Sequence, residues 1–203
     1  MPLSLGDGLT LYFCRHGETE GNVAKRYQGH SLDSPLTPKG IEQARTIGHI
    51  LDARAPGIRG YEFVSSPIGR ARATMEIIRQ TLGLPRDGYA VDDRLKEINY
   101  GIWEGHPRNN VRVLDPAAYD AREQDKWNIA PPGGESYAQV AERADSWISS
   151  LSADTFSVTH GAFARVLRGV LLGLDWQGIT KLDEPQGVVF RVRGSAVERL
   201  EAP

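Results

Sequence analysis

The sequence predicts an α/β protein, a three-layer α/β/α sandwich around a mainly parallel sheet. The first reason is that short apolar runs of strand type alternate along the chain with segments of helical periodicity. The second is that two of these runs end alike, in His16-Gly17 and in His160-Gly161, each at a corner that leads toward a helix. The 203 residues, 40% of them hydrophobic, can form one sizeable core, so we expect a single domain over residues 1–203.

In the first half of the chain, strands are expected at Leu9–Cys14, at Tyr61–Ser65 and, as a short piece, near Val91. One helix is expected to begin at Thr37-Pro38. The next is expected to begin at Ser66-Pro67, because serine caps free N–H groups and proline suits the first helical position. Four apolar residues at helical spacing predict the buried face of this second helix: Ala71, Met75, Ile78 and Leu82.

Expected strands and helices also alternate in the second half of the chain. The charged segment Asn110–Lys126 is loosely periodic, and we expect it to be helical and to cover the sheet edge that carries His16. The Pro-Pro-Gly-Gly run at 131–134 is too short and too central for a linker, so it predicts a loop. A strand at Thr155–Val158 is expected between two amphipathic helices. The chain is expected to end in a hairpin at a sheet edge, made of Val188–Val192 and Ala196–Leu200.

Arginine and histidine residues stand where the expected strands end. Arg15 and His16 close the first strand, Arg70 lies in the first turn of a helix, and His160 follows a later strand. Because the carboxyl ends of parallel strands meet at one edge of a sheet, these side chains should lie close together. Arginine at a helix N-terminus opposes the helix dipole unless an anion lies nearby. A guanidinium can grip an oxyanion while an imidazole attacks it, so the pattern indicates an oxyanion site.

With these residues the chain resembles the histidine phosphatase superfamily, also called the phosphoglycerate mutase-like family. The resemblance runs in order from about Leu11 to about Leu172 and rests on a set of motifs: Arg15-His16-Gly17-Glu18-Thr19, Asn22, Arg70 after Ser65-Ser66-Pro67, Glu97 and His160-Gly161. It implies the phosphoglycerate mutase-like fold and a reaction that passes through a phosphohistidine.

The resemblance also implies the catalytic roles. His16 is the nucleophile, and Arg15, Arg70 and His160 hold the phosphoryl group. Glu97 protonates the leaving oxygen. From the residues alone, Glu97, Glu104 and Asp92 are all candidates for that acid, and Glu104 is expected to be structural.

Further residues are implied to bind the substrate. Asn22 resembles the family's asparagine that donates to the phosphate, while Gln28 and Gly29 resemble the loop that covers the substrate. Tyr100 and Gly161 complete the expected binding residues. The residues expected to select the leaving group are Arg26, Gln28, Tyr100, Arg108 and the Asn110–Lys126 segment.

The imidazole of His16 must be neutral to attack phosphorus. Positive charges on Arg15 and Arg70 should lower its pKa and keep it neutral at physiological pH. Its other ring nitrogen needs an acceptor that fixes the tautomer, and the sequence does not say which group provides it. The charge on His160 stays open.

Composition excludes several classes of function. A net charge of -2 gives no electrostatic case for nucleic acid, and no apolar run is long enough for a membrane span. No signal-peptide pattern occurs, and the single Cys14 suits a reducing cytoplasm and a place in the core. A tyrosine-phosphatase loop would need arginine six positions after Cys14, where Glu20 stands. No metal-ligand spacing and no Walker lysine occur, so we expect no metal and no cofactor.

Three functions remain, and the sequence ranks them. A phosphatase acting on a small phosphorylated metabolite is favoured over a phosphoglycerate mutase. The resembling mutases carry an asparagine after His-Gly, where this chain has Ala162, and a basic residue next to the acid, where it has Ile98. A module that only binds phosphorylated ligands is disfavoured because every catalytic position is filled. A homodimer is compatible with the sequence.

Overall fold

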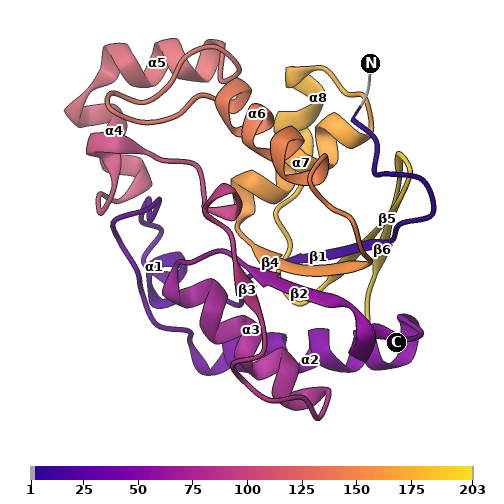
Figure 1. The fold of residues 1–203 in the computed structure, drawn as a ribbon. Helices are drawn as coiled ribbons and strands as arrows, with labels where there is room; N and C mark the ends of the chain where they lie inside the picture. The colour runs from indigo at the N-terminus through magenta and orange to yellow at the C-terminus, as the bar shows by residue number, and fades with distance from the viewer. Residues whose placement is uncertain (1–2, 203) are drawn as a thin grey trace.

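The computed structural model describes residues 3–202, which contain a six-stranded sheet in the order β3-β2-β4-β1-β5-β6 (Figure 1). Four neighbouring strands are parallel, and the hairpin β5–β6 is antiparallel at one edge. The strands are β1 (Leu11–Arg15), β2 (Glu62–Ser65), β3 (Ala90–Val91), β4 (Thr155–Thr159), β5 (Val189–Arg193) and β6 (Ala196–Leu200). The predicted mainly parallel sheet and the edge hairpin are confirmed.

Helices cover both faces of this sheet, as Figure 1 shows. On one face lie α2 (Pro38–Arg54) and α3 (Gly69–Thr81). On the other lie α6 (Tyr137–Ile148), α7 (Gly161–Leu171) and α8 (Trp176–Lys181). Alternate side chains of β1 divide between the layers, because Tyr12 and Cys14 pack with α2 and α3 whereas Leu11 and Phe13 pack with α6 and α7. The predicted three-layer sandwich is therefore confirmed.

Cys14 lies in the core, as the sequence predicts, with no exposed surface. Burial raises the pKa of its thiol, so the group is inert at neutral pH.

The structure confirms the predicted start of α2 and contradicts the predicted start of α3. Helix α2 begins after Thr37, whose side chain accepts a hydrogen bond from the backbone N–H of Gly40, as predicted. The predicted start of α3 at Ser66-Pro67 is wrong, because α3 begins at Gly69 with Ile68 as its N-cap. The Ser66 hydroxyl contacts His160 instead of capping a helix turn. The buried face predicted for α3 is confirmed.

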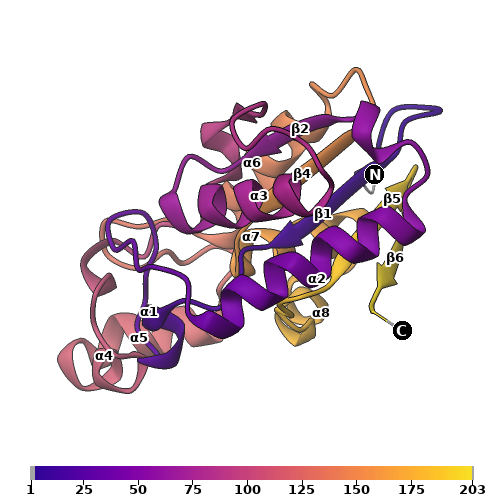
Figure 2. The same ribbon diagram turned by 90° about the horizontal axis from the view of Figure 1, so that it is seen from below.

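The remaining short helices are α1 (Glu20–Val23), α4 (Arg108–Leu114) and α5 (Pro116–Gln124), which Figure 2 draws on the side of the molecule toward which the carboxyl end of β1 points. The helical prediction for 110–126 is thus confirmed. The part of the chain that the structure describes also contains three short 3₁₀ helices: η1 (Ile58–Gly60), η2 (Asp93–Leu95) and η3 (Gly101–Trp103). No helix within residues 3–202 is long and apolar enough to cross a membrane.

Candidate active site

The register of two central strands places the histidines side by side. Arg15, the last residue of β1, pairs with Thr159, the last residue of β4. The next residues, His16 and His160, therefore leave the same edge of the sheet together, and their ring centroids are 5.2 Å apart. Both rings are almost entirely buried.

The His16 ring has a defined tautomer. Its Nδ1 lies 2.7 Å from the carbonyl oxygen of Gly17, so Nδ1–H donates to that oxygen. The other nitrogen, Nε2, keeps its lone pair and accepts a hydrogen bond from Nε of Arg70 at 3.2 Å. The acceptor that the sequence left unnamed is thus the backbone of the next residue.

Two positive charges and burial keep His16 neutral. Its pKa lies well below the ordinary value of 6.5, first because the ring is buried and then because Arg70 and Arg15 repel a further positive charge. The direction agrees with the prediction, although burial has a larger effect than the arginines. A neutral imidazole is a competent nucleophile once its Nε2 lone pair is released from Arg70.

Arg70 is fixed by the loop that precedes α2. Its Nη2 donates to the carbonyl of Gly29 at 2.9 Å, and its Nη1 donates to the carbonyl of Leu32 at 3.1 Å. The carboxylate of Asp33 lies 3.6 Å from Nη1 and also accepts a hydrogen bond from the Arg70 backbone N–H. The guanidinium is buried, and its aim at His16 is set by these contacts.

Arg15 is held from the opposite side by the segment that leads into β5. Its Nη1 donates to the backbone carbonyl of Glu184 at 2.6 Å and lies 3.8 Å from the Glu184 carboxylate, which also pairs with Arg165 at 3.2 Å. A Cβ on Gly161 would lie 2.7 Å from Oε2 of Glu184 and 3.1 Å from Cζ of Arg15. Glycine at 161 therefore gives the arginine and the carboxylate the space that they occupy.

His160 has one bonded and one unbonded ring nitrogen. Nε2 lies 2.7 Å from Oγ of Ser66, whereas the buried Nδ1 has no hydrogen-bond partner. The pKa of His160 lies well below 6.5, first because of burial and then because of Arg70, His16 and Arg15. Burial and these neighbouring groups therefore favour the neutral form of His160 in the free protein.

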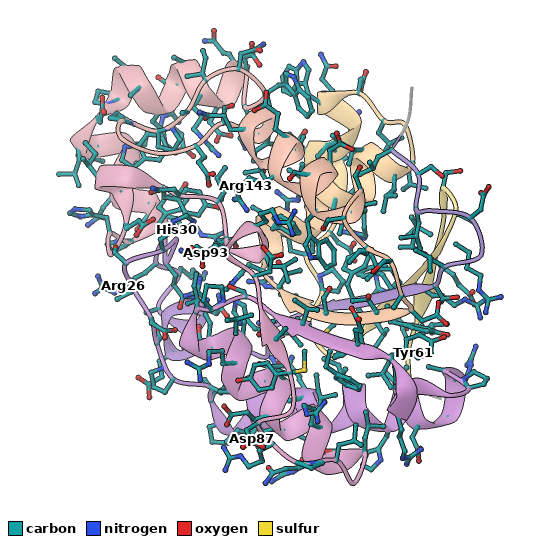
Figure 3. The ribbon with its side chains drawn as sticks, in the orientation of Figure 1. Arg26, His30, Tyr61, Asp87, Asp93 and Arg143 are labelled. Atoms are coloured by element: carbon teal, nitrogen blue, oxygen red, sulfur yellow. The ribbon has the colours of Figure 1, made fainter. Side chains whose placement is uncertain are left out.

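Glu97 lies at the N-terminus of α7, next to His160. Its carboxylate accepts hydrogen bonds from the backbone N–H groups of Phe163, at 3.1 Å, and of Ala162, at 3.3 Å. From α6, Arg143, which is labelled in Figure 3, is partly buried. It donates to the backbone carbonyl of Glu97 at 3.2 Å and so anchors the segment.

The two other carboxylate candidates are engaged elsewhere. Glu104 accepts hydrogen bonds from the backbone N–H groups of His30, Ser31 and Tyr100, so it ties two loops together. Asp92 forms an ion pair with Arg94 at 2.7 Å. Of the three candidates, Glu97 alone contacts the helix that His160 begins.

The expected binding residues divide into two groups. Asn22 borders an open cleft, and its Oδ1 accepts hydrogen bonds from the Thr19 backbone and from Gln186. Gln28 is buried and binds the Thr19 hydroxyl at 2.9 Å, so its side chain supports the loop from within. Gly29 offers its carbonyl to Arg70, and Tyr100 packs on Tyr27 with ring centroids 4.5 Å apart. The roles of these residues in binding remain predictions.

The cleft has a volume of about 900 Å³ and is lined by Arg15 and Asn22, but not by the buried His16 and His160. Its walls come from the segment after β1, the start of α4 and the segment before β5. Figure 3 shows Arg26 of this wall on the same side of the molecule as His30. Basic side chains outnumber acidic ones in the lining, with Arg15, Lys25, Arg26 and Arg108 against Glu18 and Glu184. Residues 3–202 contain no cluster of three or more His, Cys, Asp or Glu side chains suited to a metal ion.

Comparison with known proteins identifies the family. The family model for the histidine phosphatase superfamily, branch 1, matches residues 11–196. The chain belongs to this superfamily. The matched range includes every residue on which the sequence resemblance rested, and the predicted phosphoglycerate mutase-like fold is confirmed.

The relatives and solved structures that resemble the chain are named for different activities, a mutase and two phosphatases. A probable phosphoglycerate mutase of Salmonella paratyphi C is 32% identical over 206 residues, which cover 95% of this chain and 85% of that protein. The α-ribazole phosphatase of Shigella flexneri has a TM-score of 0.81 at 25% identity, covering 96% of each chain. A mycobacterial glucosyl-3-phosphoglycerate phosphatase has a TM-score of 0.78 at 26% identity, covering 96% of this chain and 99% of the other.

Sequence reasoning missed Ser66, Glu184 and Gln186 as parts of the site. Ser66 was assigned to a helix cap, although a polar residue directly after a parallel strand was the available signal. Glu184 and Gln186 precede β5, which runs antiparallel to β1 and therefore begins at the edge where β1 ends. That pairing is not visible from sequence alone.

Proposed function

We propose that this protein is a phosphomonoesterase that hydrolyses a small phosphorylated metabolite through a phosphohistidine on Nε2 of His16. One observation carries the proposal: a neutral imidazole donates from Nδ1 to Gly17 and directs its Nε2 lone pair at Arg70. The arrangement supplies a nucleophile next to a fixed cation. A phosphate dianion needs both at the same point.

The first step transfers the phosphoryl group. Nε2 of His16 attacks phosphorus in line, a nitrogen–phosphorus bond forms, and the bond from phosphorus to the ester oxygen breaks. Arg15, Arg70 and His160 hold the phosphoryl oxygens, and Glu97 in its protonated form gives the leaving oxygen a proton. The alcohol then departs.

The second step releases phosphate. The carboxylate of Glu97 takes a proton from water, whose oxygen attacks phosphorus, and the nitrogen–phosphorus bond breaks. Inorganic phosphate leaves, and His16 is again neutral. Because two guanidinium groups supply the positive charge in both steps, we propose that catalysis does not depend on a metal ion.

The cleft supports a polar leaving group. Lys25, Arg26 and Arg108 provide positive charge at its rim, and its other walls are mostly amide and carboxylate side chains. A leaving group with hydroxyl groups or a second negative charge would find partners there. The solved phosphatases that resemble the chain are named for α-ribazole and for glucosyl-3-phosphoglycerate. We propose a metabolite of comparable polarity as the substrate, and the cytoplasm as the place of action.

A phosphoglycerate mutase is the second candidate, because the relative at 32% identity bears that name. Ala162 favours the phosphatase, since the resembling mutases have asparagine after the His-Gly pair. The two functions differ in the product formed from a phosphoglycerate.

The test combines a panel of phosphate esters, scored by kcat/KM for phosphate release, with an assay of phosphoglycerate interconversion. Rapid acid-free quenching should trap a phosphoryl group on the wild-type protein and none on His16→Ala. Phosphate release with trapping supports the phosphatase, and interconversion without release would replace it by the mutase. Ester binding without a trapped intermediate or turnover would leave only a binding module.

A further inference from the structure

Ser66 lies beside His160 because of strand pairing. It follows β2 directly, Ser65 pairs with Val158 of β4, and the Ser66 backbone N–H donates to the carbonyl of Val158 at 3.0 Å. The pairing of β2 with β4 thus places the Ser66 hydroxyl at the end of β4, next to His160. Neither Ser66 nor His160 has exposed surface. The 2.7 Å contact from Oγ to Nε2 is therefore closed to water.

The direction of this hydrogen bond follows from counting donors and acceptors. The Ser66 oxygen already accepts from the backbone N–H of Ile68 at 3.4 Å, and its only hydrogen can go to Nε2 of His160. In that arrangement the ring proton of His160 is on Nδ1, and the buried Nδ1–H is the one group of this pair without a hydrogen-bond partner. If the ring proton were on Nε2 instead, Nε2–H would donate to Oγ of Ser66. The hydroxyl hydrogen of Ser66 and the Nδ1 lone pair of His160 would then both lack a hydrogen-bond partner. A second unpaired buried group is costly, so the Nδ1–H form is favoured.

The unpaired donor lies among groups that attract an anion. Nδ1 of His160 has no partner, and neither does the buried Nε of Arg15. The His16 ring is 5.2 Å from the His160 ring, and Arg70 bonds to His16. A buried N–H without an acceptor destabilises the free protein, and an oxygen of a bound phosphoryl group would relieve that cost.

We propose that Ser66 is a positioning residue that holds neutral His160 in its Nδ1–H tautomer, so that Nδ1 donates to an oxygen of the transferring phosphoryl group. The donation to substrate rests on the proposed function. The tautomer does not, because it follows from the contacts of the free protein. Ser66 acts only through His160 and takes no part in bond making.

The experiment measures the tautomer directly. Nitrogen-15 spectra of the histidine rings distinguish a nitrogen that carries hydrogen from one that does not, and the five histidines are assigned with His160→Gln. We expect hydrogen on Nδ1 in the wild-type protein and a shift toward Nε2–H in Ser66→Ala. The matched control is Ser65→Ala, which removes a buried hydroxyl one residue earlier that donates to the Ser66 carbonyl and not to His160.

Activity gives the second readout. Ser66→Ala should lower kcat and vanadate affinity about 10- to 100-fold, the range for loss of one well-aligned hydrogen bond to a charged group. Ser65→Ala should stay within about threefold of wild type. A wild-type ring with hydrogen on Nε2 would overturn the proposal, whether or not Ser66→Ala folds. An unchanged tautomer in folded Ser66→Ala would do the same. The Nδ1–H tautomer in a protein without phosphatase activity would instead contradict the proposed function.

Discussion

Nε of Arg70 lies 3.2 Å from Nε2 of His16 and donates a hydrogen bond to the lone pair that would attack phosphorus. In the free protein the nucleophile is therefore partly masked by its own electrostatic partner. A substrate phosphoryl oxygen can take over this donor, which releases the lone pair at the moment when phosphorus arrives. Burial, and then the positive charge of Arg70, lower the pKa of His16. The same charge would stabilise the oxygens of a bound phosphoryl group.

Removal of the nucleophile should abolish turnover. We expect His16→Ala to lower kcat by about 10⁴-fold or more, as for other covalent nucleophiles. The fold should persist because His16 follows β1 instead of lying within it. The control is His49→Ala, which changes an exposed residue of α2. Steady-state kinetics and thermal unfolding check both variants, and activity of His16→Ala within tenfold of wild type would exclude His16 as nucleophile.

Two of the three arginines of α3, Arg70 and Arg72, offer a matched pair. Arg70 is buried against His16, whereas Arg72 lies exposed two residues later. Arg70→Ala should weaken vanadate binding and lower kcat/KM at least about 10- to 100-fold, since charge-assisted hydrogen bonds contribute about 1.5–3 kcal/mol each. Arg72→Ala should change neither value by more than about twofold. Equal vanadate affinities in the two variants would argue against phosphoryl binding by Arg70.

Glu97 should matter most for poor leaving groups. Glu97→Gln keeps the size of the side chain and removes the transferable proton, so phosphorylation by alkyl phosphates should slow by about 10²–10⁴-fold. With p-nitrophenyl phosphate the loss should be much smaller, because p-nitrophenolate leaves without a proton. Burst kinetics isolate this first step from the later attack of water.

Glu104→Gln is the control for Glu97, because Glu104 ties loops together through backbone N–H groups. It should lower the thermal unfolding temperature and affect both substrates alike. If Glu97→Gln also slowed both substrates equally, Glu97 would be a structural or binding residue.

The pKa shifts of His16 and His160 predict a loss of stability in acid. Both values lie below 6.5 in the folded protein, so between that pH and the folded values the unfolded chain binds more protons. The free energy of unfolding is therefore retained above pH of about 6.5 and falls below it, by up to about 1.4 kcal/mol per pH unit for each ring. Urea unfolding at pH 7.5 and pH 5.5 measures this. His16→Gln should reduce the difference, and an unchanged difference would contradict the assignment to these rings.

Chelation should leave activity unchanged. Arg15 and Arg70 supply the charge that neutralises the phosphoryl group, so incubation with EDTA should alter kcat/KM by less than about twofold. The check is to add zinc, magnesium or manganese back to the chelated protein. Activity that falls on chelation and returns with one metal would show that a metal ion takes part.

The sequence by itself determined the fold class and the corners that carry Arg15, His16, Arg70 and His160. These are local properties, since apolar periodicity sets each strand or helix and the residues that follow it stand at its end. Even here one local rule failed: the serine-proline pair at 66–67 has the pattern of a helix start, yet the Ser66 hydroxyl bonds to a ring 94 residues away.

Only the tertiary structure decided how these groups are held. The register of β1 on β4 brings the two histidines together, and the antiparallel approach of β5 brings Glu184 to Arg15 across 169 positions of sequence. Glu97 meets the first N–H groups of α7 because a loop crosses the carboxyl edge of the sheet at that point. Hydrogen bonds act over about 3 Å. The partners of each catalytic group therefore depend on which distant segments pack next to it. Local sequence patterns do not specify that packing.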